Sequence, residues 1–330
     1  MMAKTNERKV SLARLLDLAP LILLIFFFIV FALVDNRIVT PDNLLQIVVQ
    51  AAPIAILGLG AMIVLISAGI DLSAGYGVSM CSVIAAMMLR ETGSLFAAVA
   101  VVLLAGLLLG LFNGFFIGVL KMESFIVTLG SMTVAQGVTL YLASSGGVLT
   151  VSNATLKTIG IGRTLGIPNL IIVAVVLILI AAFVIRKTSF GMRTYGIGSS
   201  LESTRVAGVS IVNQQMLIYL FSGLCTAFTA LMLVSRVAIV SPNLGGTNLM
   251  LDAITATVVG GTSIFGGRGS IVGTLLGALL ISLITQAMSI IGINPTSLDF
   301  FKGLFIVLAL VLDSLIRAGK LKLGKRQAIA

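Results

Sequence analysis

The few residues that could do chemistry in this chain lie at breaks between long apolar runs. Asp71 stands in the glycine-spaced segment SAGIDLSAGYG, and Asp252 stands near the start of a short apolar run. A carboxylate at such a position is costly unless it caps a helix or meets a cation or water. Two roles therefore stay open for Asp71: it, or Ser73, caps the following helix, or it lines a path for a polar solute. The same two roles stay open for Asp252.

Asn113 and Thr128 are polar positions inside apolar runs. Within a membrane, such side chains hydrogen-bond between helices, and they can also bond to a polar solute that passes. Bonding between helices is the ordinary role for both. Together with Asp71 and Asp252, they are the candidate residues for a translocation path.

Several kinds of site are excluded by what the chain lacks. It has no His, no Gly-x-x-x-x-Gly-Lys-Ser/Thr phosphate loop, no cluster of His, Asp and Glu, and no serine dyad signature. We therefore expect no catalytic, cofactor or metal site, and no nucleotide site in this chain. The glycine row in GGTSIFGGRGSIVGTLLGALL indicates close helix packing instead. Cys81 and Cys225 lie in apolar runs and are expected to be small core residues.

The longest hydrophilic stretch, residues 186–214, carries a second set of signals. Ser199 precedes Glu202 by three residues, which is the spacing of a capping box, where each side chain caps the other residue's backbone N–H. Glu202 and Arg205 can then pair on one face, and Gly208 supplies the left-handed residue that ends helices. These signals predict a short helix between the cap and Gly208. It is either an ordinary loop helix or a docking element for a soluble partner.

The elements that must position these residues are membrane spans. The chain is 58% hydrophobic and 10% charged, with a mean hydropathy of +1.19, which indicates an all-α polytopic membrane protein. We expect about ten transmembrane helices. The apolar runs are Leu18–Val34, Leu44–Ser67, Val78–Leu89, Leu95–Val119, Phe125–Ala143, Asn169–Ile185, Gln215–Val234, Leu249–Val259, Ile271–Ile291 and Phe300–Ile316.

The distribution of positive charge predicts how these spans are oriented. With the N-terminus inside, 15 of the 21 Lys and Arg residues lie on the inner side. The six on the outer side are Arg37, Arg90, Lys157, Arg163, Arg236 and Lys302. This bias predicts cytoplasmic tails over 1–17 and 317–330, a single transmembrane domain over 18–316, and a cytoplasmic helix over Ser200–Ala207. The net charge of +10 is therefore a topology signal and not a nucleic-acid signal.

An internal similarity predicts an inverted repeat. RETGSLFAAVAVVLLAGLLLG, from Arg90, resembles GGRGSIVGTLLGALLISLI, from Gly266, and each would stand at the same place in a unit of four spans. The third run, Val78–Leu89, has 12 residues, which cover about 18 Å as a helix against a hydrocarbon core of about 30 Å. The eighth run is short too. In inverted-repeat transporters, two such short, glycine-interrupted spans mark the translocation path.

Four motifs carry a resemblance to a known family. They are SAGIDLSAG (67–75), FNGFFIGVLKMESFIVTLG (112–130), VVGGTSIFGGRGSIVGTLLGALLI (258–281) and the FGMRTYGIG loop. In order and over nearly the whole chain, they resemble the permease subunits of bacterial ABC importers for ribose and related monosaccharides. The resemblance implies a multi-pass permease domain in the inner membrane and a second permease copy or paralogue. It also implies a periplasmic sugar-binding protein and cytoplasmic ATPase subunits, which hydrolyse the ATP.

The resemblance further implies a role for the hydrophilic stretch. The helix around Glu202 would dock into the ATPase, so Ser199, Glu202, Arg205 and Gly208 become the candidate coupling residues. The expected function is translocation of a monosaccharide or polyol, and not catalysis. Two alternatives stay open: a branched-chain amino acid or nucleoside permease of the same superfamily, and a stand-alone secondary transporter. The latter needs ion coupling by buried acids, of which the chain has few.

Overall fold

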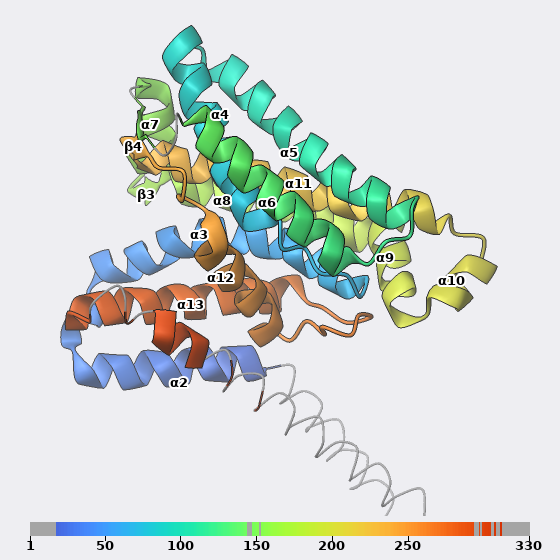
Figure 1. Cartoon of the computed structure of the whole chain (residues 1–330). Coiled ribbons are helices and arrows are strands. Elements are labelled where there is room, and N and C mark those ends of the chain that lie inside the picture. The colour runs from blue at the N-terminus through green and yellow to red at the C-terminus, as the bar shows by residue number, and fades with distance from the viewer. Residues whose placement is uncertain are drawn as a thin grey trace, which may run out of the picture.

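The computed structural model describes residues 18–143, 147–151, 153–293, 297, 299–304, 307 and 311, which form an all-α membrane fold (Figure 1). Within this part of the chain, six helices are long and apolar enough to cross a membrane. They are α3 (Pro41–Ile66), α5 (Leu95–Gly118), α6 (Ser124–Leu142), α8 (Asn169–Lys187), α11 (Ile211–Arg236) and α13 (Ile271–Ile291). The prediction of a polytopic α-helical membrane protein is therefore confirmed.

Three shorter or more polar helices occupy further predicted runs. They are α2 (Ala19–Val34), α4 (Ala74–Thr92) and α12 (Gly246–Val259). Nine of the ten predicted runs thus coincide with helices. The tenth, Phe300–Ile316, lies largely outside the described residues, so the count of ten spans stays a prediction.

The expectation that the third span is short was wrong. α4 has 19 residues, because residues 74–77 before the apolar run and 90–92 after it are helical as well. One of them, Gly75, packs so closely on Gly246 of α12 that a Cβ atom would collide with the Gly246 carbonyl. At its other end, α4 stops at Gly93, whose φ of +64° is left-handed. Apolar content therefore located the middle of this helix but not its start. The other short run corresponds to α12, which has only 14 residues.

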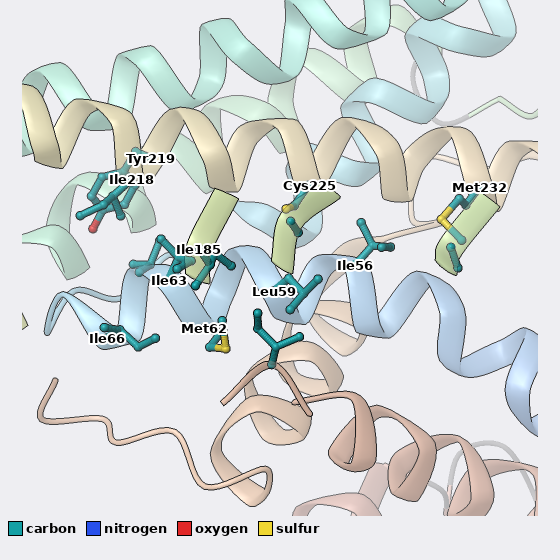
Figure 2. Packing of buried hydrophobic residues seen from close by; sticks show 14 of the residues in the cluster. Ile56, Leu59, Met62, Ile63, Ile66, Ile185, Ile218, Tyr219, Cys225 and Met232 are labelled. Atoms are coloured by element: carbon teal, nitrogen blue, oxygen red, sulfur yellow. The ribbon is translucent and has the colours of Figure 1, made fainter. Parts of the chain in front are cut away.

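The centre of the fold is α3. Every residue from 51 to 66 is buried, as is typical of a helix that is apolar on all sides. α3 packs against α8, α11, α12 and α13. Figure 2 shows Leu59 and Ile63 of α3 in one hydrophobic cluster with Tyr219 and Cys225 of α11. The segment that leaves the buried end of α3 is therefore held inside the bundle.

Glycines let α5 and α11 approach each other closely. Four glycines recur at every fourth position on the α5 face that meets α11, at 106, 110, 114 and 118. A Cβ atom at Gly106 would collide with the carbonyl oxygen of Gly223, and one at Gly110 with that of Tyr219. Such rows of small residues are the usual interface of membrane helices.

The glycine row near α13 has the packing role that the sequence predicted. Gly273 lies against the backbone of Gly260, which follows α12, and Gly277 lies against the carbonyl of Ala256. Neither site has room for a Cβ atom. The interpretation as close helix packing is therefore confirmed for this segment.

Short elements order the connecting segments. They are η1 (Asn36–Val39), α7 (Ala154–Ile161), α9 (Ser189–Ser199), α10 (Leu201–Val206), β1 (Leu149–Thr150), β2 (Arg163–Thr164), β3 (Ile167–Pro168) and β4 (Ile239–Val240). β2 and β3 form a hairpin, and β1 pairs antiparallel with β4, with Leu149 opposite Val240. The connection between α6 and α8 is thereby tied to the one between α11 and α12.

Candidate functional site

The carboxylate of Asp71 lies at the centre of a buried hydrogen-bond network. It belongs to the segment 67–73 between α3 and α4, and it is 8% exposed. Its Oδ1 atom accepts from the backbone N–H of Ser73 at 3.0 Å and from the Ser73 hydroxyl at 2.6 Å. Its Oδ2 atom accepts from the hydroxyl of Ser222, on α11, at 2.7 Å. Asp71 therefore fixes the start of α4 to α11 through neutral donors.

The capping role is realised only in part. Ser73 occupies the N-cap position of α4, as one alternative expected, but its side chain makes no capping hydrogen bond. Its hydroxyl donates to Asp71 instead. The N-terminus of α4 is thus organised by a turn in which Asp71 accepts from a residue two positions later.

Asn113 extends this network to α5 and brings an unused acceptor. Its Nδ2 group donates to the Ser73 hydroxyl at 2.8 Å, and the residue is 1% exposed. Its Oδ1 atom is buried and has no hydrogen-bond partner among the described residues. A buried acceptor without a donor costs about 1–3 kcal/mol. A hydroxyl group or a water molecule that reached this atom would satisfy it.

Thr128 joins the same region from α6. Its hydroxyl lies 2.8 Å from the carbonyl of Ser124 and 3.2 Å from that of Ile70. The Ser124 hydroxyl accepts from the Ile70 N–H at 3.1 Å, so the first two turns of α6 hold both backbone groups of Ile70. Three of the four sequence candidates thus converge on residues 70–73. We call this set the polar cluster: Ile70, Asp71, Ser73, Asn113, Ser124, Thr128 and Ser222.

Asp252 lies apart from the polar cluster. Its Oδ2 atom is 2.8 Å from the Nζ atom of Lys302, and the two side chains are 13% and 15% exposed. Asp252 is well inside α12, whose N-cap position is Gly245, so the expectation that it caps this helix was wrong. Its partner Lys302 is one of the six cations expected on the outer side. The pair bridges α12 and the helical residues after 298, and removal of either charge would leave the other charge without its partner.

A cavity of about 660 Å³ lies beside the polar cluster. It reaches Gly69, Ser124 and Tyr219, which border or belong to the cluster. On its other side it is lined by Leu201 and Arg205 of α10. The cavity therefore separates the polar cluster from the helix that the hydrophilic stretch was expected to form.

That helix exists, but its cap is one residue later than predicted. Ser199 is the last residue of α9, and its hydroxyl donates to the carbonyl of Tyr195 at 2.9 Å. Ser200 has the extended backbone that a cap requires, with φ at −163°, and its Oγ accepts from the N–H of Ser203 at 3.2 Å. Serine is a good N-cap residue at either position, so the three-residue spacing to Glu202 predicted Ser199 where Ser200 is the cap.

The remaining signals of the stretch are placed as expected. Glu202 and Arg205 pair at 4.0 Å on an exposed face, and Gly208 has a left-handed φ of +82°. α10 presents Val206 at 82% exposure, and it lies at the edge of the molecule in Figure 1. Its exposed surface is open to a partner.

Gly198 connects this region to the polar cluster, and sequence reasoning missed it. A Cβ atom at Gly198 would collide with the carbonyl oxygen of Ile66, the last residue of α3. The same carbonyl accepts from the N–H of Gly267 at 2.9 Å. α9 therefore touches the residue from which the segment 67–73 departs. A glycine in GIGSS gives no local signal for such a contact, because the contact joins residues more than a hundred positions apart.

Comparison with known families identifies the chain. The family described as the permease component of a branched-chain amino acid transport system matches residues 43–310. The chain belongs to this permease family. The permease is a multi-pass membrane protein, and the part of it that the structure describes holds the six candidate spans given above. The resemblance expected from the four motifs is confirmed by this family together with the relatives below.

Individual relatives cover nearly the whole permease. It is 32% identical to the ribose import permease protein of Haemophilus influenzae, over 97% of this chain and 100% of that one. It is 30% identical to the ribose import permease protein of Escherichia coli, over 94% and 97% of the two chains. It is 29% identical to the autoinducer 2 import system permease protein of Escherichia coli, over 95% and 91%. No solved structure matches the permease.

Proposed function

We propose that this permease is the membrane subunit of an ABC importer that carries a monosaccharide or polyol. A periplasmic binding protein delivers the solute, and separate cytoplasmic ATPase subunits hydrolyse ATP. The observation that carries the proposal is the near full-length similarity to two ribose import permeases. The family description names branched-chain amino acids, which keeps amino acid import as the second candidate.

The chemistry of the polar cluster supports a hydroxylated solute. All donors to Asp71 are neutral, and both of its oxygens are occupied. An amino acid would bring a carboxylate, for which the polar cluster contains no cation and which would lie beside the like charge of Asp71. The open Oδ1 acceptor of Asn113 instead suits a hydroxyl donor. We place the translocation path along Asp71, Asn113 and Thr128. Asp252 contributes to this path through its ion pair with Lys302.

The coupling of ATP hydrolysis to this path follows a chain of direct contacts. α10 docks on the ATPase, with Ser199, Glu202, Arg205 and Gly208 setting its position. Its displacement moves α9, whose Gly198 bears on the end of α3. The segment 67–73 begins there and carries Asp71, so a shift of α9 moves the polar cluster. Rigid packed elements of this kind transmit displacement.

The architecture of the proposed importer is a pair of inverted repeats with ten spans. The first unit is α3 to α6, and the second begins with α11, α12 and α13. In such a repeat, α3, α4 and α5 correspond to α11, α12 and α13. The contacts agree with this correspondence, because α3 packs on α11, α12 and α13, and α11 packs on α3, α4 and α5. Ser94 and Ser270 cap α5 and α13 in the same way, each accepting from the third residue that follows. Both termini are cytoplasmic, and two permeases pair in the complex.

Transport by a reconstituted complex tests the function. Proteoliposomes that contain the permease and its ATPase, supplied with the binding protein, are assayed with labelled ribose and with labelled leucine. We expect ribose uptake that requires ATP and all three components. Uptake of leucine alone would favour the amino acid alternative. Uptake by the permease alone, driven by a proton or sodium gradient, would make it a secondary transporter and overturn the proposal.

A further inference from the structure

A second cavity, of about 550 Å³, lies where α8 ends and α9 and α13 begin. The last turn of α8 contributes Arg186 and Lys187, and α9 contributes Ser189 and Tyr195. The start of α13 closes it, fixed by a hydrogen bond from the Tyr195 hydroxyl to the carbonyl of Gly269 at 2.8 Å. The importer mechanism proposed above uses none of these side chains.

The charge of this cavity is positive and uncompensated. Neither Arg186 nor Lys187 makes an ion pair with a carboxylate in the part of the chain that the structure describes, and no acidic residue lines the cavity. Arg186 and Tyr195 both line the cavity, and the Arg186 charge acts against the rise that burial causes in the pKa of the Tyr195 phenol. The two cations are exposed, and an anion in the cavity would pair with both.

The surface next to the cavity shows which anion fits. α8 presents an exposed apolar stripe at helical spacing. Its members are Ile172, Val175, Val176, Leu179, Ile180 and Phe183. The same spacing of three or four residues continues from Phe183 to Arg186 and Lys187, so the stripe ends at the cavity. An acyl chain along the stripe would place a phosphate between the two cations.

We propose that this cavity binds the phosphate head group of an anionic phospholipid, with an acyl chain along α8. Basic pockets between membrane helices are the usual site for such head groups. The backbone N–H groups in the first turns of α9 and α13 add hydrogen-bond donors that carry partial positive charge, as the two cations do. The bound lipid would anchor α9, and hence the orientation of α10, to the membrane surface.

Native mass spectrometry of the detergent-solubilised full-length permease tests the site. Phosphatidylglycerol and phosphatidylcholine are titrated against the unaltered chain and against the double variant Arg186→Gln/Lys187→Gln. We expect the double variant to lose phosphatidylglycerol affinity by roughly tenfold or more, with little change for phosphatidylcholine. The matched control is Lys157→Gln/Arg163→Gln, which removes one lysine and one arginine far from the cavity and should bind as the unaltered chain does. Equal loss in both double variants, or no loss in either, would overturn the proposal.

A substitution that adds charge separates a lost site from a lost fold. Ser189 is exposed at the first turn of α9, where a carboxylate stabilises a helix. Ser189→Glu should therefore keep α9 formed and still repel the phosphate, so we expect weaker phosphatidylglycerol binding with an unchanged elution profile. Inorganic phosphate and glycerol phosphate at millimolar concentration serve as competitors. If either binds as tightly as phosphatidylglycerol does, the acyl chain contributes nothing, the occupant is a free phosphate and the lipid proposal is wrong.

Discussion

Asp71 accepts three hydrogen bonds, and they come from two different helices. Two donors belong to Ser73 at the start of α4, and the third is the hydroxyl of Ser222 on α11. No cation is within ion-pair distance among the described residues. The carboxylate therefore acts first as an acceptor that assembles the segment 67–73. Contact with a solute, in the proposed path, follows from that placement.

The first prediction separates these two roles by replacing Asp71 with Asn or with Leu. Asp71→Asn keeps an acceptor for Ser73, and the Ser222 hydroxyl can reverse to accept from the new amide. Asp71→Leu leaves buried donors unpaired, at about 1–3 kcal/mol each. We expect near-normal membrane levels for Asp71→Asn and strongly reduced levels for Asp71→Leu, measured by quantitative blotting alongside uptake. Normal levels but abolished uptake in Asp71→Asn would show that the charge itself acts in the path.

The cap of α10 gives a second prediction at single residues. Ser200→Ala removes the hydroxyl that accepts from the Ser203 N–H, which costs about 1 kcal/mol of helix stability. Glu202→Ala removes only an exposed pair, worth roughly 0.3 kcal/mol. In the reconstituted complex, Ser200→Ala should reduce substrate-stimulated ATP hydrolysis more than Glu202→Ala does. The reverse order would mean that Glu202 contacts the ATPase directly.

At the scale of elements, the apolar runs predicted nearly every long helix, because burial in lipid requires them. They did not predict α7, α9 or the pairing of β1 with β4, which depend on contacts between distant residues. The same limit applies to the site. Asp71, Asn113 and Thr128 could be selected as polar residues in an apolar setting, but their convergence on residues 70–73 could not. Gly198 and Ser222 act only through partners far along the chain, so no local pattern reveals them.

The contact between α9 and α3 yields a third prediction. Gly198→Val must push α9 away from the Ile66 carbonyl, because a Cβ atom has no room there. The ATPase should still bind, since α10 and its exposed face are unchanged. We expect ATP hydrolysis that no longer responds to loaded binding protein, with uptake reduced at least about tenfold. Pull-down of the ATPase measures binding separately. Normal uptake in a folded Gly198→Val permease would remove this contact from the coupling route.

Helix packing gives a fourth prediction, with a control in the same protein. Gly106 lies in the interface of α5 with α11, and overpacking such a site typically costs about 1–3 kcal/mol. Gly137 on α6 has no atom within 4 Å of the position that a Cβ atom would take, so a side chain has room there. Gly106→Val should therefore lower the temperature of inactivation in detergent, followed by size-exclusion chromatography. Gly137→Val should change it little. Equal effects would show that backbone propensity dominates over packing.

At the scale of the whole molecule, the main prediction is the orientation in the membrane, with α10 on the cytoplasmic side. Cys81 and Cys225 are free and buried, which confirms them as core residues and leaves the surface clear for labelling. Our fifth prediction uses Lys157→Cys on α7 and Val206→Cys on α10, both at exposed positions. A membrane-impermeant maleimide added to spheroplasts should label Lys157→Cys only. Labelling of Val206→Cys in intact spheroplasts would invert the orientation and rule out docking of α10 on a cytoplasmic ATPase.

The hydrogen bond between Asp71 and Ser222 can form only after a delay during synthesis of the chain. The two residues are 151 positions apart, and a ribosome adds about 5–20 residues per second, so Asp71 waits on the order of 10–30 s for its partner. During that interval the carboxylate has only its two hydrogen bonds from Ser73, in an incomplete bundle where an acid costs about 3 kcal/mol on insertion scales. The N-terminal half therefore inserts before its buried hydrogen-bond network is complete, and the network is completed only when α11 is synthesised.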